Sequence, residues 1–247
     1  MSLEETRLGG RRALVGGDGD DVLVFLHGGG GLHRDPSVEL LAGDLRIVAP
    51  ELPGFSAGED DGDTSSFDAI AEWVVAALDE AHVETFTLAG VSFGAVLALH
   101  LALAHPDRVD ALVLLAPAAF QPEDWRLPDL DDLDRALFAH PGPRPEPPDE
   151  ATFGRRAEIL GRLVGGLDRE RLRARIAAID APTLVVFGTE DGLIPPEMGR
   201  EYRAAMPTCS LVYLYDAAHE LGWDRPDALA ELVGDFARRR EAFVVGA

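Results

Sequence analysis

The chain has 247 residues, 47% of them hydrophobic and 27% charged, which is the composition of a globular protein with a large buried core. Its 44 acidic and 22 basic residues give a formal charge of −22, which disfavours nucleic acid and anionic membrane surfaces as partners. A single cysteine, Cys209, excludes an intrachain disulfide. Because the N-terminus lacks the pattern of a secretory signal and no apolar stretch could span a bilayer, we expect a cytoplasmic protein.

The first elements are predicted to be a hairpin and a buried strand. Residues 6–15 are weakly patterned and could form the hairpin, and the Asp/Gly cluster at 18–21 lacks the later ligands and the closing Glu of a calcium loop. Residues 22–26 form a continuous apolar run, as expected for a strand that is buried on both faces of a mostly parallel sheet.

Four glycines, residues 28–31, follow His27 at the end of this strand. They leave the backbone bare, so that amide groups can approach a ligand closely. A phosphate-binding loop would need Gly-Lys-Ser/Thr after the glycines, and a dinucleotide-binding fingerprint would need glycine at position 33. Leu32 and His33 stand there instead, which disfavours both alternatives.

The pattern then alternates between strand and helix. Residues 45–49 are predicted to be a second core strand that runs into a rigid Pro/Gly turn, and apolar residues recur at helical spacing from 67 to 81. Residues 85–105 are predicted to form a strand, a tight turn and an apolar helix, with Ser92 at the apex of the turn between Gly90 and Gly94. Such a turn forces the serine into a strained conformation and exposes its hydroxyl above the sheet edge.

After another strand at 109–115, the composition changes. Residues 118–180 show no strand pattern; a proline-rich linker at 141–148 precedes an amphipathic helical stretch at 157–179 that is broken at Gly165 and Gly166. We expect a helical cap at 118–180, inserted into a core domain of residues 1–117 and 181–247, although an ordinary long excursion is the alternative. The sheet then resumes with strands at 183–187 and 211–215, each followed by a helix, at 195–206 and 226–240.

Three reactive residues each follow a predicted strand: Ser92, Asp191 and His219. Ligand chemistry in parallel α/β sheets takes place at the carboxyl ends of the strands. A serine hydroxyl is a poor nucleophile at pH 7 unless a base removes its proton, and imidazole titrates in the right range. We therefore expect His219 to be the base and Asp191 to orient its ring.

The order serine, acid, histidine is that of the α/β-hydrolase arrangement. With His27-Gly28, Gly90-x-Ser92-x-Gly94, Gly188-x-x-Asp191 and His219, the chain resembles the α/β-hydrolase fold family over nearly its whole length. The resemblance implies a mostly parallel central sheet with helices on both faces and a helical cap inserted between core strands. It also implies a hydrolase with a Ser-Asp-His triad.

Attack of Ser92 on a carbonyl would produce an oxyanion, and we expect the amides of Phe93 and of Gly29 or Gly30 to stabilise it. Glu190, Asp216 and Glu220 are rival acids, and His33 is a rival base.

We expect His33, Trp125 and Phe138 to contribute to substrate binding. No metal or organic cofactor is implied, and the expected partner is a small acyl substrate.

The function predicted first is hydrolysis of small carboxylic esters or lactones through an acyl-enzyme. Carbon–carbon hydrolases of meta-cleavage products are an alternative with a similar glycine loop, but they often carry Trp after the base, where this chain has Glu220. A cofactor-free perhydrolase would use the same residues, and a non-catalytic binding protein is a further alternative. Dehalogenases and epoxide hydrolases of the family use Asp as nucleophile, so Ser92 disfavours them.

Overall fold

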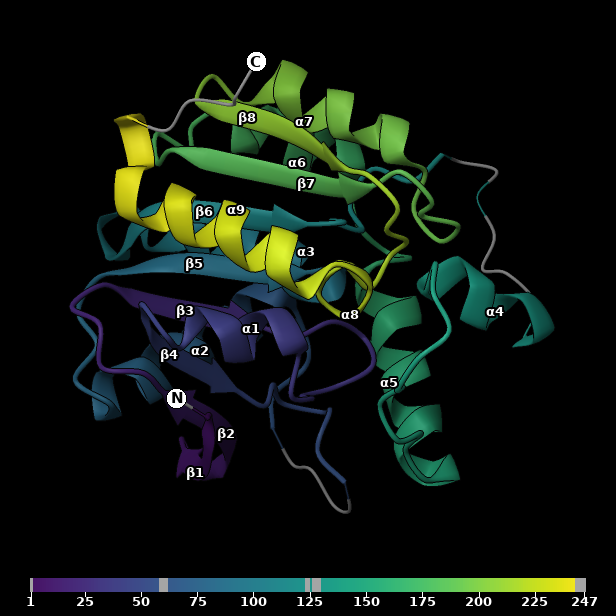
Figure 1. Cartoon of the computed structure of the whole chain (residues 1–247), viewed down its shortest axis with the longest axis horizontal. Coiled ribbons are helices and arrows are strands. Elements are labelled where there is room, and N and C mark those ends of the chain that lie inside the picture. Colours follow the sequence, from purple (N-terminus) through teal and green to yellow (C-terminus); the bar gives the residue numbers. More distant parts are fainter. Residues whose placement is uncertain (1, 58–61, 123–124, 126–129, 243–247) are drawn as a thin grey trace.

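The computed structural model describes residues 2–57, 62–122, 125 and 130–242. Within these residues the centre is an eight-stranded sheet in the order β1-β2-β4-β3-β5-β6-β7-β8 (Figure 1). The strands are β1 Glu4–Leu8, β2 Arg11–Gly16, β3 Val22–Leu26, β4 Arg46–Pro50, β5 Phe86–Val91, β6 Val109–Leu115, β7 Thr183–Gly188 and β8 Cys209–Leu214. β2 pairs antiparallel with β1 and β4, whereas all pairs from β4 to β8 are parallel. The predicted hairpin and parallel sheet are confirmed.

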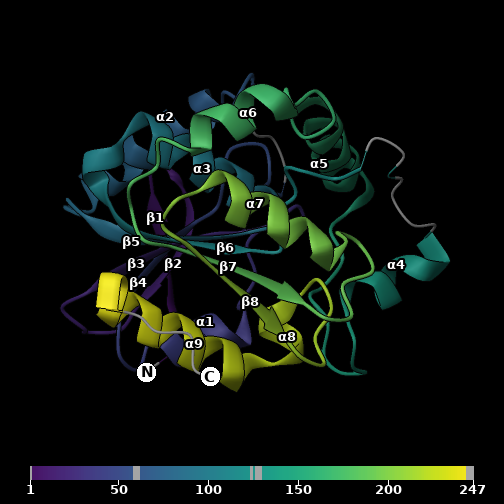
Figure 2. The same cartoon turned by 90° about the horizontal axis from the view of Figure 1, so that it is seen from above.

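Helices cover both faces of this sheet. They are α1 Pro36–Leu41, α2 Phe67–Glu80, α3 Phe93–Ala104, α4 Leu130–Leu137, α5 Glu150–Leu163, α6 Arg169–Ile176, α7 Gly199–Ala205, α8 Leu221–Asp224 and α9 Pro226–Arg239. Figure 2 shows α2, α3, α6 and α7 on one face and α1 and α9 on the other. The described part of the chain contains no helix with the length and apolar composition needed to cross a bilayer.

The core lies between the sheet and these helices. Every residue of β5 and β7 is buried, which explains why these strands are continuous apolar runs rather than alternating ones. α3 is also buried almost all round. Its exposed end is tied to α2, since His100 Nδ1 lies 2.7 Å from Asp68 Oδ1 and His105 Nε2 lies 2.9 Å from Glu72 Oε1.

Side-chain caps fix where several helices begin. Ser66 Oγ accepts the N–H of Ala69 at 3.0 Å, so α2 begins at Phe67 as predicted. The helical stretch predicted from residue 157 in fact begins at Glu150, because Asp149 caps α5, and its second half is the separate helix α6. α1 was not predicted, although Asp35 and a proline at its first position mark its start.

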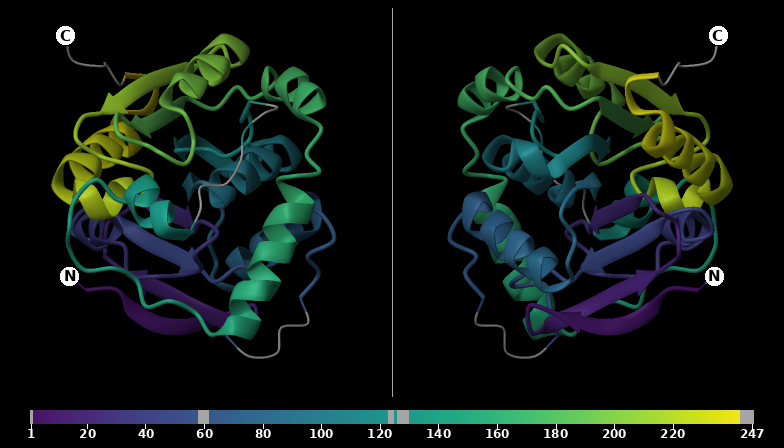
Figure 3. Two further views of the ribbon diagram at one scale, coloured as in Figure 1. Left: turned by 90° about the vertical axis from the view of Figure 1, so that its right-hand side faces the viewer. Right: turned by 90° about the vertical axis from the view of Figure 1, so that its left-hand side faces the viewer.

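The segment between β6 and β7 carries α4, α5 and α6 and has no strand among its described residues. Figures 1 and 3 show α4 and α5 beyond the carboxyl ends of the parallel strands. Of the inserted helices, α4 and α5 therefore lie at the edge of the sheet where ligand chemistry is expected, whereas α6 packs on a face of the sheet.

Candidate active site

The predicted reactive residues leave the sheet at a single edge. Ser92, Asp191 and His219 follow β5, β7 and β8, and the glycine loop (residues 28–31) follows β3. Because these strands are parallel and β6 alone separates β5 from β7, their carboxyl ends lie together.

Ser92 lies at a sharp turn between β5 and α3. Its backbone has φ 54° and ψ −113°, a strained conformation for a residue with a side chain. The flanking glycines let the chain close: a Cβ on Gly90 would lie 2.4 Å from the carbonyl oxygen of Gly94, and one on Gly94 would lie 2.2 Å from that of Leu26. The N–H of Phe93 opens α3, where an amide has no intrahelical acceptor. The turn therefore has the strand–turn–helix geometry that the sequence pattern predicts.

His219 and Asp191 form a buried pair. Nδ1 of the ring lies 3.0 Å from Oδ2 of the carboxylate, and both side chains are almost completely inaccessible to solvent. Asp191 Oδ1 accepts the N–H groups of Leu193 at 2.9 Å and Ile194 at 2.8 Å, which fixes the carboxylate. Burial by itself lowers the pKa of His219, but the charge and hydrogen bond of Asp191, with the charge of Glu220, leave that pKa raised.

The other ring nitrogen of His219 is the one that a serine base would use. Because Asp191 accepts the proton of Nδ1, Nε2 is left as a hydrogen-bond acceptor. Nε2 is buried and has no hydrogen-bond partner among the described residues, so Ser92 Oγ is not bonded to it in this structure. Such bonds are often long in the absence of a ligand and tighten in the Michaelis complex.

Two of the three rival acids, Glu190 and Asp216, are not paired with His219. Glu190 is exposed, whereas Asp191 is buried. Asp216 Oδ2 lies 3.1 Å from His140 Nε2 and 3.9 Å from Arg225 Nη1. Asp191 is therefore the carboxylate that is hydrogen-bonded to the ring of His219.

Glu220 is a half-buried carboxyl beside His219. Burial raises its pKa to about 7; the positive charge of His219 opposes this, and the negative charges of Asp35, Asp191 and Asp224 add to it. Several carboxylates thus surround Glu220, which the sequence did not reveal because Asp35 caps α1 and Asp224 belongs to α8.

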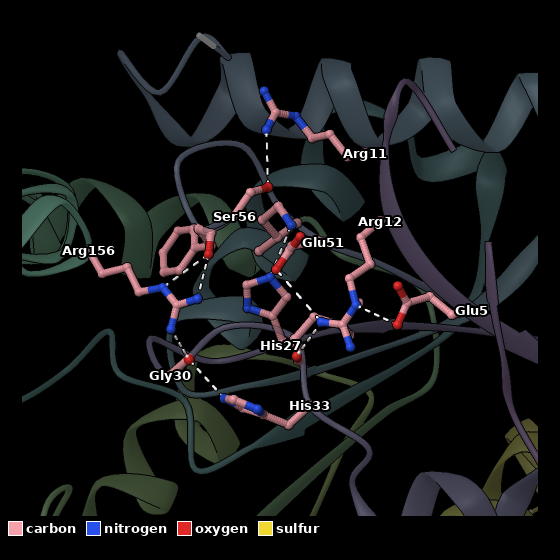
Figure 4. Close-up of polar contacts among 12 residues, drawn as sticks. Glu5, Arg11, Arg12, His27, Gly30, His33, Glu51, Ser56 and Arg156 are labelled. Atoms are coloured by element: carbon pink, nitrogen blue, oxygen red, sulfur yellow. Dashed lines mark hydrogen bonds and ion pairs between the residues drawn. The ribbon is translucent and has the colours of Figure 1, made fainter. Parts of the chain in front are cut away.

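The glycine loop is held by two histidines (Figure 4). His27 Nδ1 donates to the carbonyl of Gly28 at 2.8 Å, and its Nε2 accepts the N–H of Leu52 at 3.0 Å. Burial lowers the pKa of His27 to about 3, so the ring is neutral and both nitrogens are used. His33 Nε2 donates to the carbonyl of Gly30 at 2.9 Å. Both rings support the loop, and His33 is not placed as a rival base.

Arg156 of α5 is a site residue that the sequence did not single out. Its Nη1 donates to the carbonyl of Gly30, and its Nε and Nη2 donate to the carbonyl of Phe55, the former at 3.1 Å. This one guanidinium therefore joins the loops after β3 and β4.

Asp224 of α8 was also missed. Its carboxylate accepts the N–H groups of Ala139 at 2.9 Å, His140 at 3.2 Å and Ala218 at 2.8 Å. Because Ala218 precedes His219, this carboxylate links the end of α4 to the histidine loop.

The predicted aromatic residues lie on the inserted segment. Trp125 Nε1 donates to the carbonyl of Leu193 at 2.7 Å, beside the Asp191 loop. The guanidinium of Arg144 lies over the ring of Phe138, with Cζ 3.9 Å from the ring centroid. No group of three or more His, Cys, Asp or Glu side chains is placed to hold a metal ion in the residues that the structure describes.

Comparison with known proteins decides the family. A model described as "Alpha/beta hydrolase family" matches residues 23–232. The chain belongs to the alpha/beta hydrolase family. The fold predicted from the alternation of strands and helices and from the resemblance is confirmed.

Relatives of this alpha/beta hydrolase include two hydrolases that are named after 2-hydroxy-6-oxo compounds. It is 28% identical over 256 residues to a 2-hydroxy-6-oxononadienedioate/2-hydroxy-6-oxononatrienedioate hydrolase of Pseudomonas putida, with 89% of this chain and 88% of the relative covered. It is 28% identical over 252 residues to a 2-hydroxy-6-oxo-6-phenylhexa-2,4-dienoate hydrolase of Burkholderia cepacia, with 87% of each covered. A solved hydrolase of that same name from Rhodococcus sp. strain RHA1 has a TM-score of 0.77 at 22% identity, with 96% of this chain and 99% of that one covered. This structural likeness shows a shared fold.

Proposed function

We propose that this alpha/beta hydrolase is a serine hydrolase that cleaves the carbon–carbon bond beside the ketone of a meta-cleavage product. The observation that supports the mechanism is the buried His219–Asp191 pair: Nε2 of His219 has no hydrogen-bond partner among the described residues, and His219 follows a strand at the same sheet edge as Ser92. The bond type is supported by the relatives, whose names describe 2-hydroxy-6-oxo-dienoates and their close analogues. The relatives thus favour the carbon–carbon alternative over the esters and lactones that the sequence ranked first.

In the proposed mechanism, Ser92 Oγ attacks the ketone carbon while His219 Nε2 takes the hydroxyl proton. Asp191 holds the ring by its Nδ1–H and stabilises the imidazolium that forms. Collapse of the tetrahedral adduct breaks the carbon–carbon bond, and the imidazolium returns the proton to the departing dienol carbon. Water, activated by the same base, then releases the acyl group from Ser92.

The oxyanion of the adduct needs donors that are already in place. We assign this role to the amides of Phe93 and of Gly29 or Gly30, none of which has a backbone acceptor among the described residues. Loss of one such donor typically raises the barrier by about 3 kcal/mol.

We also propose that residues 118–180 form a helical cap over a core of residues 1–117 and 181–247. Support comes from the close packing of α5 on the glycine loop, since a Cβ on Gly29 would lie 2.8 Å from Leu160 Cδ1. His33, Trp125 and Phe138 are then proposed to border the space for a small acyl substrate.

A small neutral ester or lactone is the second candidate substrate. One observation favours it: Glu220 lies next to His219, with Asp35 and Asp224 near enough to raise its pKa, and negative charge there would repel the carboxylate of a dienoate. The ester candidate would use the same three catalytic residues.

A substrate panel separates the two candidates. The parent and Ser92→Ala are assayed with 2-hydroxy-6-oxo-6-phenylhexa-2,4-dienoate, with p-nitrophenyl esters of increasing chain length and with simple lactones. We expect kcat/KM for the dienoate to exceed that for the best ester by more than about tenfold, a transition-state preference of about 1.4 kcal/mol. The reverse order would favour the second candidate, and turnover that survives Ser92→Ala would contradict both.

A further inference from the structure

The glycine loop contains a short chain of hydrogen-bonded peptide groups. The N–H of Gly31 donates to the carbonyl of Gly28 at 3.1 Å. A planar peptide group joins each carbonyl to the N–H of the next residue, so the Gly30 carbonyl and the Gly31 N–H move and polarise together. In the same way, the Gly28 carbonyl belongs with the N–H of Gly29. The Gly29 amide, a proposed oxyanion donor, is therefore the last donor of the chain.

The other end of the chain is the buried guanidinium of Arg156. Its Nη1 donates to the Gly30 carbonyl, which also accepts from His33, and Figure 4 shows the two side chains meeting at this oxygen. Arg156 is only 8% exposed, and in the described part of the chain its hydrogen bonds go to carbonyls, while the carboxylates of Glu51 and Asp149 act on it only at longer range. Its charge is therefore directed at backbone carbonyls, and a guanidinium keeps that charge throughout the working pH range.

The fit between Arg156 and the loop depends on glycine. Gly31 has φ +92°, and a Cβ there would lie 2.4 Å from Arg156 Nη2. The guanidinium can reach the Gly30 carbonyl because this position has no side chain. Its other face is fixed by the carbonyl of Phe55, so the arginine has little freedom to move.

We propose that Arg156 is a positioning residue of the oxyanion hole: through the peptide groups of the glycine loop, it fixes and polarises the Gly29 amide. The proposal rests on the serine-hydrolase function proposed above. In a chain of hydrogen bonds each donor polarises the next, by about 10–30% per bond, and a buried charge at one end acts in the same direction. Because Arg156 belongs to α5, the Gly29 amide is held in position only when this inserted helix is packed on the core.

A matched control is the neighbouring Arg155. It is also on α5 and also donates to core carbonyls, through Nε to Gly54 at 3.1 Å and through Nη2 to Ser56. It contacts the turn after β4, and among the described residues it forms no hydrogen bond with the glycine loop. Substituting Arg155 therefore loosens the attachment of α5 without breaking the chain that leads to Gly29.

The experiment compares Arg156→Gln, Arg156→Lys and Arg155→Gln with the parent. One readout is kcat and KM on the substrate for which the parent shows Ser92-dependent turnover. The second is the inhibition constant of a phenylalkyl trifluoromethyl ketone, which forms a tetrahedral oxyanion adduct with an active serine. Removal of one oxyanion donor typically lowers kcat by 10²–10³, and weakening it should cost about 10- to 100-fold.

We expect Arg156→Gln to lower kcat and weaken the ketone by about the same factor, with KM within about threefold of the parent, and Arg156→Lys to fall in between. Arg155→Gln should stay within about threefold of the parent in all three quantities. Equal losses in the two glutamine variants, or a kcat that falls while ketone affinity does not, would overturn the proposal. If Arg156→Gln does not fold, parental values for both readouts in Arg156→Lys would overturn it. Ser92→Ala separates the cases, because turnover in that variant would refute the proposed function itself.

Discussion

Replacing Asp191 by asparagine tests the proposed acid–base pair with the least disturbance of the fold. Oδ1 of Asp191 accepts two amides, from Leu193 and Ile194, while Oδ2 faces Nδ1 of His219. In Asp191→Asn the side-chain oxygen keeps the two amide bonds, so the NH2 group turns toward the ring. Nδ1 must then act as an acceptor, the ring proton moves to Nε2, and the ring can no longer take a proton from Ser92.

The size of the effect follows from this change of tautomer. The same substitution in a serine-protease triad lowers kcat by about 10⁴ with the geometry intact, which corresponds to about 5.5 kcal/mol of barrier. The two retained amide bonds and the equal volume keep the loop in place, so the free energy of unfolding should change by less than about 1 kcal/mol.

The assay is steady-state turnover of the parent's best substrate, with urea unfolding on the same samples. Glu190→Gln is the matched control, since Glu190 is the exposed neighbour on the same loop. Retention of more than about a tenth of the parental kcat in a folded Asp191→Asn variant would refute the assigned role, because a ring in the wrong tautomer cannot act as the base.

Two further predictions concern the charge beside the base and the elbow. His219 must be neutral to act, and the charge of Glu220 helps to raise its pKa. Activity therefore falls as the pH drops through that raised pKa. Glu220→Gln should move the acid limb of the kcat/KM profile to lower pH, while the control Glu190→Gln leaves it in place. An acid limb that stays in place or moves to higher pH in Glu220→Gln would contradict this. In Gly94→Ala, a methyl group would lie 2.2 Å from a carbonyl oxygen of β3, and we expect the free energy of unfolding in urea to fall by at least about 2 kcal/mol. Gly161→Ala in α5 has open space and should raise it by up to about 1 kcal/mol, so that equal changes in the two variants would refute the packing argument.

Much of the fold was predictable because its signals are local. The strands β3, β5, β6 and β7 are short apolar runs bounded by turns, and the turn around Ser92 is fixed by the glycines on either side of it. The start of α5 was predicted wrongly, although Asp149 stands directly after the prolines and caps it. A capping residue after a proline run outweighed the later onset of the apolar pattern.

The residues that surround Ser92, Asp191 and His219 were not predictable from the sequence. Arg156 reaches carbonyls that are 101 and 126 residues away in the sequence, so no local pattern could connect them. The same holds for Asp224, whose partners include Ala139, 85 residues away. The sequence ranked esters first, whereas the names of the relatives support the carbon–carbon alternative.

The most direct test of the central claim is covalent labelling by a fluorophosphonate, followed by intact mass measurement and peptide mapping. Such reagents react with a serine only when a base activates it and donors stabilise the adduct. We predict one adduct per chain, located on Ser92, that is absent in Ser92→Ala and forms at least about a hundredfold more slowly in His219→Ala. A folded parent chain that takes no label, or that takes it at another residue, would contradict the account.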